Sequence, residues 1–322
     1  MRVLTLFLMI ALFMGCESQS EEAKAIEESL GVPKEESFFE EVSPPKVSER
    51  TPAAQTIEQT SPTESSVDQE TETTVRSLDE MLLFFPSRYP EGNWEPDDLH
   101  YEDVWFESSD GTKLHGWYCP AEKPVAVMLF AHGNGGHLAH RAELLKFLQT
   151  ELQVSVMMFD YRGYGRSKGV PTVQGILQDA RAAANILAEK AGVQQEELVL
   201  IGRSLGGAVM IDLAAELQPS GLIVECTFPS LKEVASIHYR KLSWIVPAGK
   251  LNSAERLAQY EGPFLQSHGT LDRVIPFHLG QQLFDAANDP KTFITIPNGN
   301  HNTPQSAEYY EALNEFLASL RE

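Results

Sequence analysis

The sequence has few cysteines, few basic residues and no apolar run long enough to cross a bilayer. Three cysteines in 322 residues cannot build a disulfide framework or a zinc site of cysteine alone. With 25 basic against 46 acidic side chains, the formal net charge is −21, and we expect no nucleic-acid partner. A dinucleotide-binding G-x-G-x-x-G motif is also missing, so we expect no cofactor.

The amino terminus has the parts of a secretory signal. Met1-Arg2 precedes an apolar run over residues 3–14, too short for a span of roughly 20 residues. Residues 12–16 read Leu-Phe-Met-Gly-Cys and resemble the lipobox of bacterial lipoproteins. That resemblance implies removal of residues 1–15, lipidation of Cys16, and anchoring to a membrane of the bacterial cell envelope. The alternative is an ordinary cleaved signal with an incidental cysteine.

The next segment differs from the rest of the chain in composition. Residues 17–77 carry 15 acidic and 5 basic side chains among Ser, Thr, Gln and Pro, without apolar periodicity. Such a segment cannot bury enough surface to offset its ordering entropy. We therefore interpret residues 16–77 as the lipidated cysteine followed by a disordered acidic tether, and residues 78–322 as one domain.

That domain alternates short apolar runs with helical stretches. A hairpin around Asp110-Gly111 is expected to join strands 104–107 and 113–118. Further strands are expected at 125–131, 154–159, 198–201, 222–224, 264–267 and 292–296, and helices at about 138–150, 172–191, 206–217, 277–287 and 305–320. This order predicts an α/β fold with a doubly wound, mostly parallel sheet.

A serine lies at a predicted sharp turn between a strand and a helix. Residues 202–206 read Gly-Arg-Ser-Leu-Gly, the G-x-S-x-G pattern. The backbone is crowded where a strand reverses into a helix, so the positions two before and two after Ser204 must lack a Cβ. The turn would lift the Ser204 hydroxyl out of the sheet at a helix amino terminus.

A serine hydroxyl needs a base, and the base needs a carboxylate to orient it. His301 is our candidate base, because it follows the last predicted strand, where ligands gather in open α/β sheets. Asp272 is our candidate acid, because it follows the strand before that one; Glu225, after an earlier strand, is the alternative. His268 and His278 fit less well, since one ends a strand and the other lies on a helix.

The reaction also needs donors for an oxyanion. We expect the backbone N–H groups of Leu205 and of Asn134, the latter in the glycine-rich segment 132–137 after a strand. His132, His137 and His140 are a weak metal candidate, since no carboxylate or cysteine completes a ligand set, so we expect no metal.

Four segments together resemble the α/β-hydrolase superfamily, and most closely its BEM46-like branch of serine hydrolases. They are residues 132–136, 160–167, 202–207 and 268–276, with residues 300–302 in agreement. The resemblance implies an α/β-hydrolase fold, a triad of Ser204, Asp272 and His301, and hydrolysis of acyl ester, thioester or lipid-like substrates through an acyl-enzyme. A peptidase or amidase of the same fold, and a non-catalytic envelope binding protein, are the alternatives.

Two features stay open at this stage. Segment 227–258 is apolar and precedes the strand of the acid, where it would form either a small lid insertion or a short helical pair on the sheet. Cys119 and Cys226 could pair in an oxidising envelope, although buried free thiols fit two strand positions better.

Overall fold

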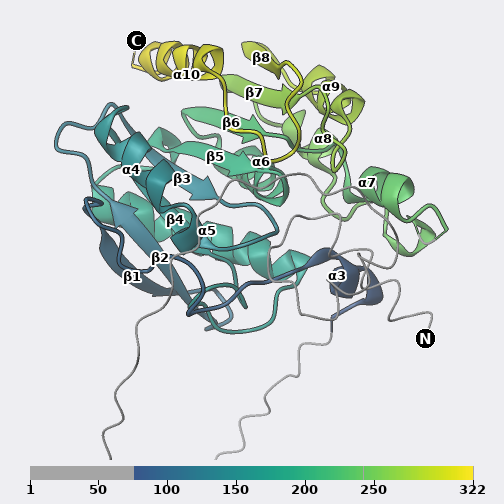
Figure 1. Cartoon of the computed structure of the whole chain (residues 1–322), viewed down its shortest axis with the longest axis horizontal. Helices are drawn as coiled ribbons and strands as arrows, with labels where there is room; N and C mark the ends of the chain where they lie inside the picture. The colour runs from purple at the N-terminus through teal and green to yellow at the C-terminus, as the bar shows by residue number, and fades with distance from the viewer. Residues whose placement is uncertain (1–75, 242, 322) are drawn as a thin grey trace, which may run out of the picture. The chain divides into compact units, whose positions relative to one another are not determined.

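The computed structural model describes residues 76–241 and 243–321, within a compact unit that spans Val75–Glu322. One eight-stranded sheet has the order β1-β2-β4-β3-β5-β6-β7-β8 (Figure 1). β1 and β2 pair antiparallel, β2 runs antiparallel to β4, and the remaining pairs are parallel. The strands are β1 (Glu102–Glu107), β2 (Lys113–Cys119), β3 (Ala126–Ala131), β4 (Val154–Asp160), β5 (Val199–Arg203), β6 (Gly221–Glu225), β7 (Phe264–Gly269) and β8 (Lys291–Ile296).

Helices cover both faces of the sheet, as expected for a doubly wound fold. One core cluster packs α4 and α10 on one face, and another packs α5, α6 and α9 on the opposite face. The helices are α3 (Leu78–Leu83), α4 (Ala142–Thr150), α5 (Val173–Ala191), α6 (Leu205–Leu217), α7 (Leu231–His238), α8 (Ser253–Leu257), α9 (Phe277–Asp285) and α10 (Ala307–Ser319). Short 3-10 turns are η1 (Leu138–His140), η2 (Gln195–Glu197) and η3 (Ser243–Ile245).

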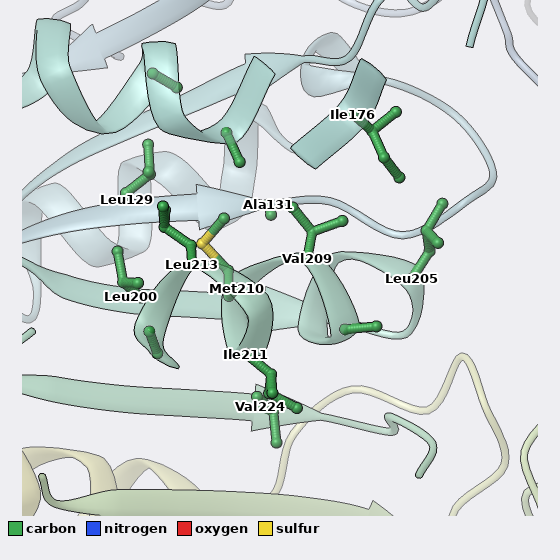
Figure 2. Packing of buried hydrophobic residues seen from close by; sticks show 14 of the residues in the cluster. Leu129, Ala131, Ile176, Leu200, Leu205, Val209, Met210, Ile211, Leu213 and Val224 are labelled. Carbon is green, nitrogen blue, oxygen red and sulfur yellow. The ribbon is translucent and has the colours of Figure 1, made fainter. Parts of the chain in front are cut away.

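Helix α6 is the most deeply buried helix and carries the serine turn at its start. Leu205, Val209 and Met210 lie between the sheet and α5, beside Ala131 and Ile176 (Figure 2). Nine of its 13 residues are buried, which matches a helix that is apolar nearly all round. This packing fixes the start of α6, and with it the position of Ser204.

The alternation predicted from the sequence is confirmed, with shifts at element ends. All eight expected strands form, and the hairpin at Asp110-Gly111 joins β1 and β2. The helix expected at 138–150 is instead a 3-10 turn and a helix, broken at Arg141, whose φ of −122° is not helical. Helix α3 was not expected. Within the described residues, no helix is both long and apolar enough to span a membrane.

Segment 227–258 contains two short helices, α7 and α8, with the 3-10 turn η3 between them. Phe228 and Val246 are buried in the main core, and α8 contacts α6 and α9. Ile237 and Trp244 remain exposed, at 40% and 77%. The inner side of the segment is thus part of the domain core, while two apolar side chains face outward.

The disulfide left open between Cys119 and Cys226 does not form. Both thiols are free and buried. Cys119 ends β2 and Cys226 follows β6, which are separated by β4, β3 and β5 in the sheet. Four steps of about 4.8 Å place these strands about 19 Å apart, far beyond the reach of a disulfide. Cys16 lies outside the described residues.

Candidate active site

Ser204 occupies a strained turn between β5 and α6. Its φ is +54° and its ψ is −118°, a backbone conformation that residues other than glycine rarely adopt. A Cβ on Gly202 would lie 2.2 Å from the carbonyl oxygen of Gly206, and one on Gly206 would lie 2.0 Å from that of Ala131. The expected need for glycine at both positions is therefore confirmed.

His301 lies in the loop between β8 and α10 and contacts both of its expected partners. Its Nε2 is 3.1 Å from Ser204 Oγ, and its Nδ1 is 2.7 Å from Asp272 Oδ2. A carboxylate can only accept, so Nδ1 carries the proton and Nε2 accepts from the serine hydroxyl. The three side chains thus form one continuous hydrogen-bonded chain.

Asp272 is held in place by its own turn. Its Oδ1 accepts from the backbone N–H groups of Val274 and Ile275, each at 2.8 Å, which leaves Oδ2 for His301. The residue is buried, at 5% exposure. Asp272 thus both closes its own turn and contacts the candidate base.

The other sequence candidates have different contacts. Glu225 lies at the end of β6 and does not touch the His301 imidazole; its carboxylate binds Arg203 and Tyr309. His268 is buried on β7, where its Nε2 lies 2.8 Å from the carbonyl oxygen of Ile275. Burial lowers the pKa of His268, which favours the neutral ring.

Cys226 lies beside Asp272 and His301, a placement that the sequence did not predict. Its Sγ, an oxygen of Asp272 and a nitrogen of His301 all lie within 4.8 Å of one another. Burial raises the pKa of the Cys226 thiol to about 12, so it stays protonated near neutral pH. A neutral thiol there adds no charge to the His301–Asp272 pair.

The glycine-rich loop after β3 lies against the serine. A Cβ on Gly133 would lie 3.6 Å from Ser204 Cβ. His132 Nδ1 lies 2.7 Å from the carbonyl oxygen of Gly133, which fixes the peptide that also carries the Asn134 N–H. Across the described part of the chain, neither Asn134 N–H nor Leu205 N–H donates a hydrogen bond to the protein. Both amides are therefore available to an oxygen outside the protein.

Side chains from distant segments hold this loop. The hydroxyl of Tyr161 donates to the carbonyl of His132 at 2.8 Å, and that of Tyr164 donates to Asn134 Oδ1 at 2.7 Å. The Asn134 side chain also donates to the carbonyl oxygen of Leu83, the last residue of α3, and accepts from the N–H of Phe85. The segment 160–167 thus supports the loop through two tyrosine hydroxyls.

The arrangement can activate a hydroxyl and receive an oxyanion, and the sheet with a serine at its sharp turn defines the class of α/β-hydrolases. The family model described as "Serine aminopeptidase, S33" matches residues 122–255. An uncharacterized protein from Mycobacterium tuberculosis is 35% identical over 255 residues, covering 76% of this chain and 89% of that protein. The chain therefore belongs to the α/β-hydrolase family.

Two further comparisons agree with this assignment. Protein bem46 of Schizosaccharomyces pombe is 28% identical over 253 residues, covering 73% of this chain and 85% of that protein. The solved structure of an esterase from Pyrococcus furiosus has a TM-score of 0.62 at 21% identity, covering 74% of this chain and 98% of that chain. At that identity the likeness concerns the fold.

Proposed function

We propose that this protein is a serine hydrolase that cleaves small-molecule carboxylic esters or thioesters through an acyl-enzyme. One observation carries the proposal: the hydrogen-bonded chain from Ser204 Oγ through His301 to Asp272, at 3.1 Å and 2.7 Å, on a strained turn. The esterase fold of the Pyrococcus furiosus neighbour supports the choice of ester substrates.

In the proposed reaction, Ser204 Oγ attacks the carbonyl carbon of the ester while its proton passes to His301 Nε2. The carbonyl oxygen becomes the oxyanion and accepts from the N–H groups of Leu205 and Asn134. His301 then gives the proton to the leaving oxygen or sulfur, and the acyl group remains on Ser204. Water, deprotonated by His301, releases the acid and restores the serine. Asp272 keeps the imidazole in the required tautomer and stabilises its cationic form.

The direct test is covalent labelling of the serine. We expect a fluorophosphonate probe to label the wild-type chain and to leave the Ser204→Ala variant unlabelled, with p-nitrophenyl ester turnover lost in parallel. Thermal unfolding of the variant at the wild-type temperature would show that the fold is intact. Turnover retained by a folded Ser204→Ala chain would overturn the assignment. A folded wild-type chain that neither labels nor turns over would favour a binding protein.

The acyl group of the substrate is proposed to be lipid-like. The exposed Trp244 and Ile237 of segment 227–258 are the apolar side chains that support this proposal. Measuring kcat/KM for p-nitrophenyl esters of rising chain length tests it. We expect kcat/KM to be highest for medium or long acyl chains, and Trp244→Ser to lower kcat/KM for those chains. A maximum at the acetate ester that Trp244→Ser does not change would contradict the proposal.

A peptidase is the second candidate, because the matching family model is described as a serine aminopeptidase. The same triad can cleave amides, so the discriminating comparison is between leaving groups. Aminoacyl p-nitroanilides and p-nitrophenyl esters of the same acyl group would be compared in one enzyme preparation. A higher kcat/KM for the anilides would replace the ester assignment with an aminopeptidase.

We also propose that Cys16 carries a lipid that anchors the mature chain to a membrane of the cell envelope, with residues 16–77 as tether. The sequence Leu-Phe-Met-Gly-Cys at residues 12–16 supports this. Expressed in a bacterial host, the wild-type chain is expected in the membrane fraction and to incorporate labelled palmitate. Cys16→Ser should do neither. Recovery of both proteins in the soluble fraction would contradict the anchor.

A further inference from the structure

A hydrogen bond connects the loop that carries His301 to β5, the strand that leads into Ser204. It connects β8, which ends at Ile296, to α10, which begins at Ala307. Arg203, the last residue of β5, donates from Nη2 to the carbonyl oxygen of His301 at 2.6 Å. The bond therefore links the backbone of the candidate base directly to the residue that precedes Ser204.

Arg203 is itself fixed from a second strand. Its Nη1 lies 3.3 Å from Glu225 Oε2, and the two residues are paired in the register of β5 and β6. The carbonyl of Glu225 also accepts from the N–H of Ser204 at 2.8 Å. The contact with Glu225 therefore orients the Arg203 guanidinium toward the carbonyl oxygen of His301.

The other oxygen of Glu225 is bound by the helix that follows the loop. Tyr309, in the first turn of α10, donates its hydroxyl to Glu225 Oε1 at 2.7 Å and is 1% exposed. Burial and the charge of Glu225 raise the pKa of Tyr309 well above its usual range, which keeps the phenol protonated as a donor. Arg203 and Tyr309 thus satisfy a carboxylate that would be costly to bury alone.

We propose that Arg203, held by Glu225 and Tyr309, is a positioning residue that sets His301 at hydrogen-bond distance from Ser204. The inference rests on the proposed function and extends it to residues that do not touch the substrate. Arg203 and Ser204 are neighbours at one strand end, so the bond to His301 O couples the base to the nucleophile. A displacement of about 1 Å at such a contact costs on the order of 100-fold in rate.

The test compares Arg203→Met, Arg203→Lys and Tyr309→Phe in the full chain with a p-nitrophenyl ester. For Arg203→Met we expect kcat to fall about 10- to 100-fold with KM within about twofold, because ground-state binding does not use His301. Arg203→Lys should recover only part of the lost kcat. A lysine restores the positive charge, but its ammonium cannot bind Glu225 and the His301 carbonyl oxygen in the geometry of a guanidinium. Tyr309→Phe should lower kcat less, because Arg203 remains.

Arg181→Met is the matched control. It makes the same substitution and also breaks arginine–carboxylate contacts, to Glu216 at 2.6 Å and Asp212 at 3.2 Å, but between solvent-facing positions of α5 and α6. We expect its kcat to equal the wild-type value. An equal fall of kcat in Arg181→Met and Arg203→Met would mean that loss of an ion pair anywhere weakens the enzyme, which would overturn the proposal.

A double-variant cycle separates positioning from a structural role. In the His301→Ala background, Arg203→Met should not change the residual rate, because the group it positions is gone. The same further loss with and without His301 would overturn the proposal, as would a wild-type kcat in Arg203→Met. Activity retained by Ser204→Ala would instead defeat the proposed function, so the two failures are distinguishable.

Discussion

At the scale of single residues, the site depends on an energetically unfavourable backbone conformation at Ser204. A positive φ in a residue other than glycine costs about 1–3 kcal/mol. Neighbours fix it: the Ser204 carbonyl accepts from Gly207 N–H at 3.0 Å and from the hydroxyl of Thr227 at 3.1 Å. The strained backbone is therefore held by α6 and by the segment that follows β6, and the side chain is left free to face His301.

Asp272→Asn should remove most of the activity without unfolding the protein. An asparagine can still accept from the amides of Val274 and Ile275, but its NH2 facing His301 Nδ1 favours a proton on Nε2. His301 then cannot accept from Ser204. We expect kcat to fall about 10³- to 10⁴-fold at an unchanged melting temperature, measured by ester turnover and thermal unfolding.

The exposed Asp285→Asn is the control for this substitution and should behave as the wild type. Near wild-type turnover in Asp272→Asn would show that the carboxylate does not set the tautomer of His301.

At the scale of elements, the turn from β5 into α6 is a packing constraint. Gly206→Ala would place a Cβ 2.0 Å from the carbonyl oxygen of Ala131, a backbone atom of β3. We expect a fall in melting temperature of about 2–12 °C, or no soluble protein, because overpacking costs about 1–3 kcal/mol or more and each kcal/mol lowers the melting temperature of a domain of this size by about 2–4 °C. Gly249→Ala, with no atom within 4 Å of its Cβ, is the control, and equal melting temperatures would contradict the prediction.

Helix α3 is held by charge rather than by its own length. Lys250 Nζ lies 2.7 Å from Asp79 and 3.1 Å from Glu80, and all three side chains are largely buried. Burial raises the pKa of both carboxyls, but Lys250 and further hydrogen bonds outweigh it and lower the pKa of each. The lysine therefore keeps two adjacent buried carboxylates ionised.

Lys250→Met should consequently destabilise the domain by about 3–5 kcal/mol, because it leaves these carboxylates without their cation. Urea unfolding at pH 7 measures the change. Lys146→Met removes a pair with the exposed Asp98 and should cost less than about 1 kcal/mol. Equal losses in the two variants would show that burial of the pair is not what matters.

The elements that the sequence predicts well are those that carry their own signal. The strands are apolar runs buried on both faces, and parallel strands bring their carboxyl ends to one edge, which placed Ser204, Asp272 and His301 near one another. Helix α3 carries no such signal, since its six residues are held by Lys250 and by Val173 N–H. The Arg203–Glu225–Tyr309 contacts depend on side-chain directions across two strands and a helix, which a pattern along one chain does not contain.

At the scale of the whole molecule, the domain buries several histidines together with one aspartate. His115, His132 and His137 are at most 1% exposed around Asp160, which is fully buried. Burial lowers the pKa of His115, and lowers that of His137 to about 4. Neither ring nitrogen of His137 has a hydrogen-bond partner among the described residues. Because the folded state disfavours the charged form of His115 and His137, protonation of these rings in mild acid favours unfolding.

Stability should therefore fall as the pH drops from about 6.5 toward 4, because the unfolded chain binds a proton on His137 that the folded chain excludes. At pH 5 this residue alone accounts for about 2 kcal/mol. Urea unfolding at pH 7, 6 and 5 tests this in His137→Phe, whose ring can keep the stacking on Trp94 at 4.9 Å. The variant should lose less stability between pH 7 and 5 than the wild type, and a constant packing cost cancels from that difference. The exposed His278→Gln should keep the wild-type slope; identical slopes in all three proteins would place the acid sensitivity elsewhere.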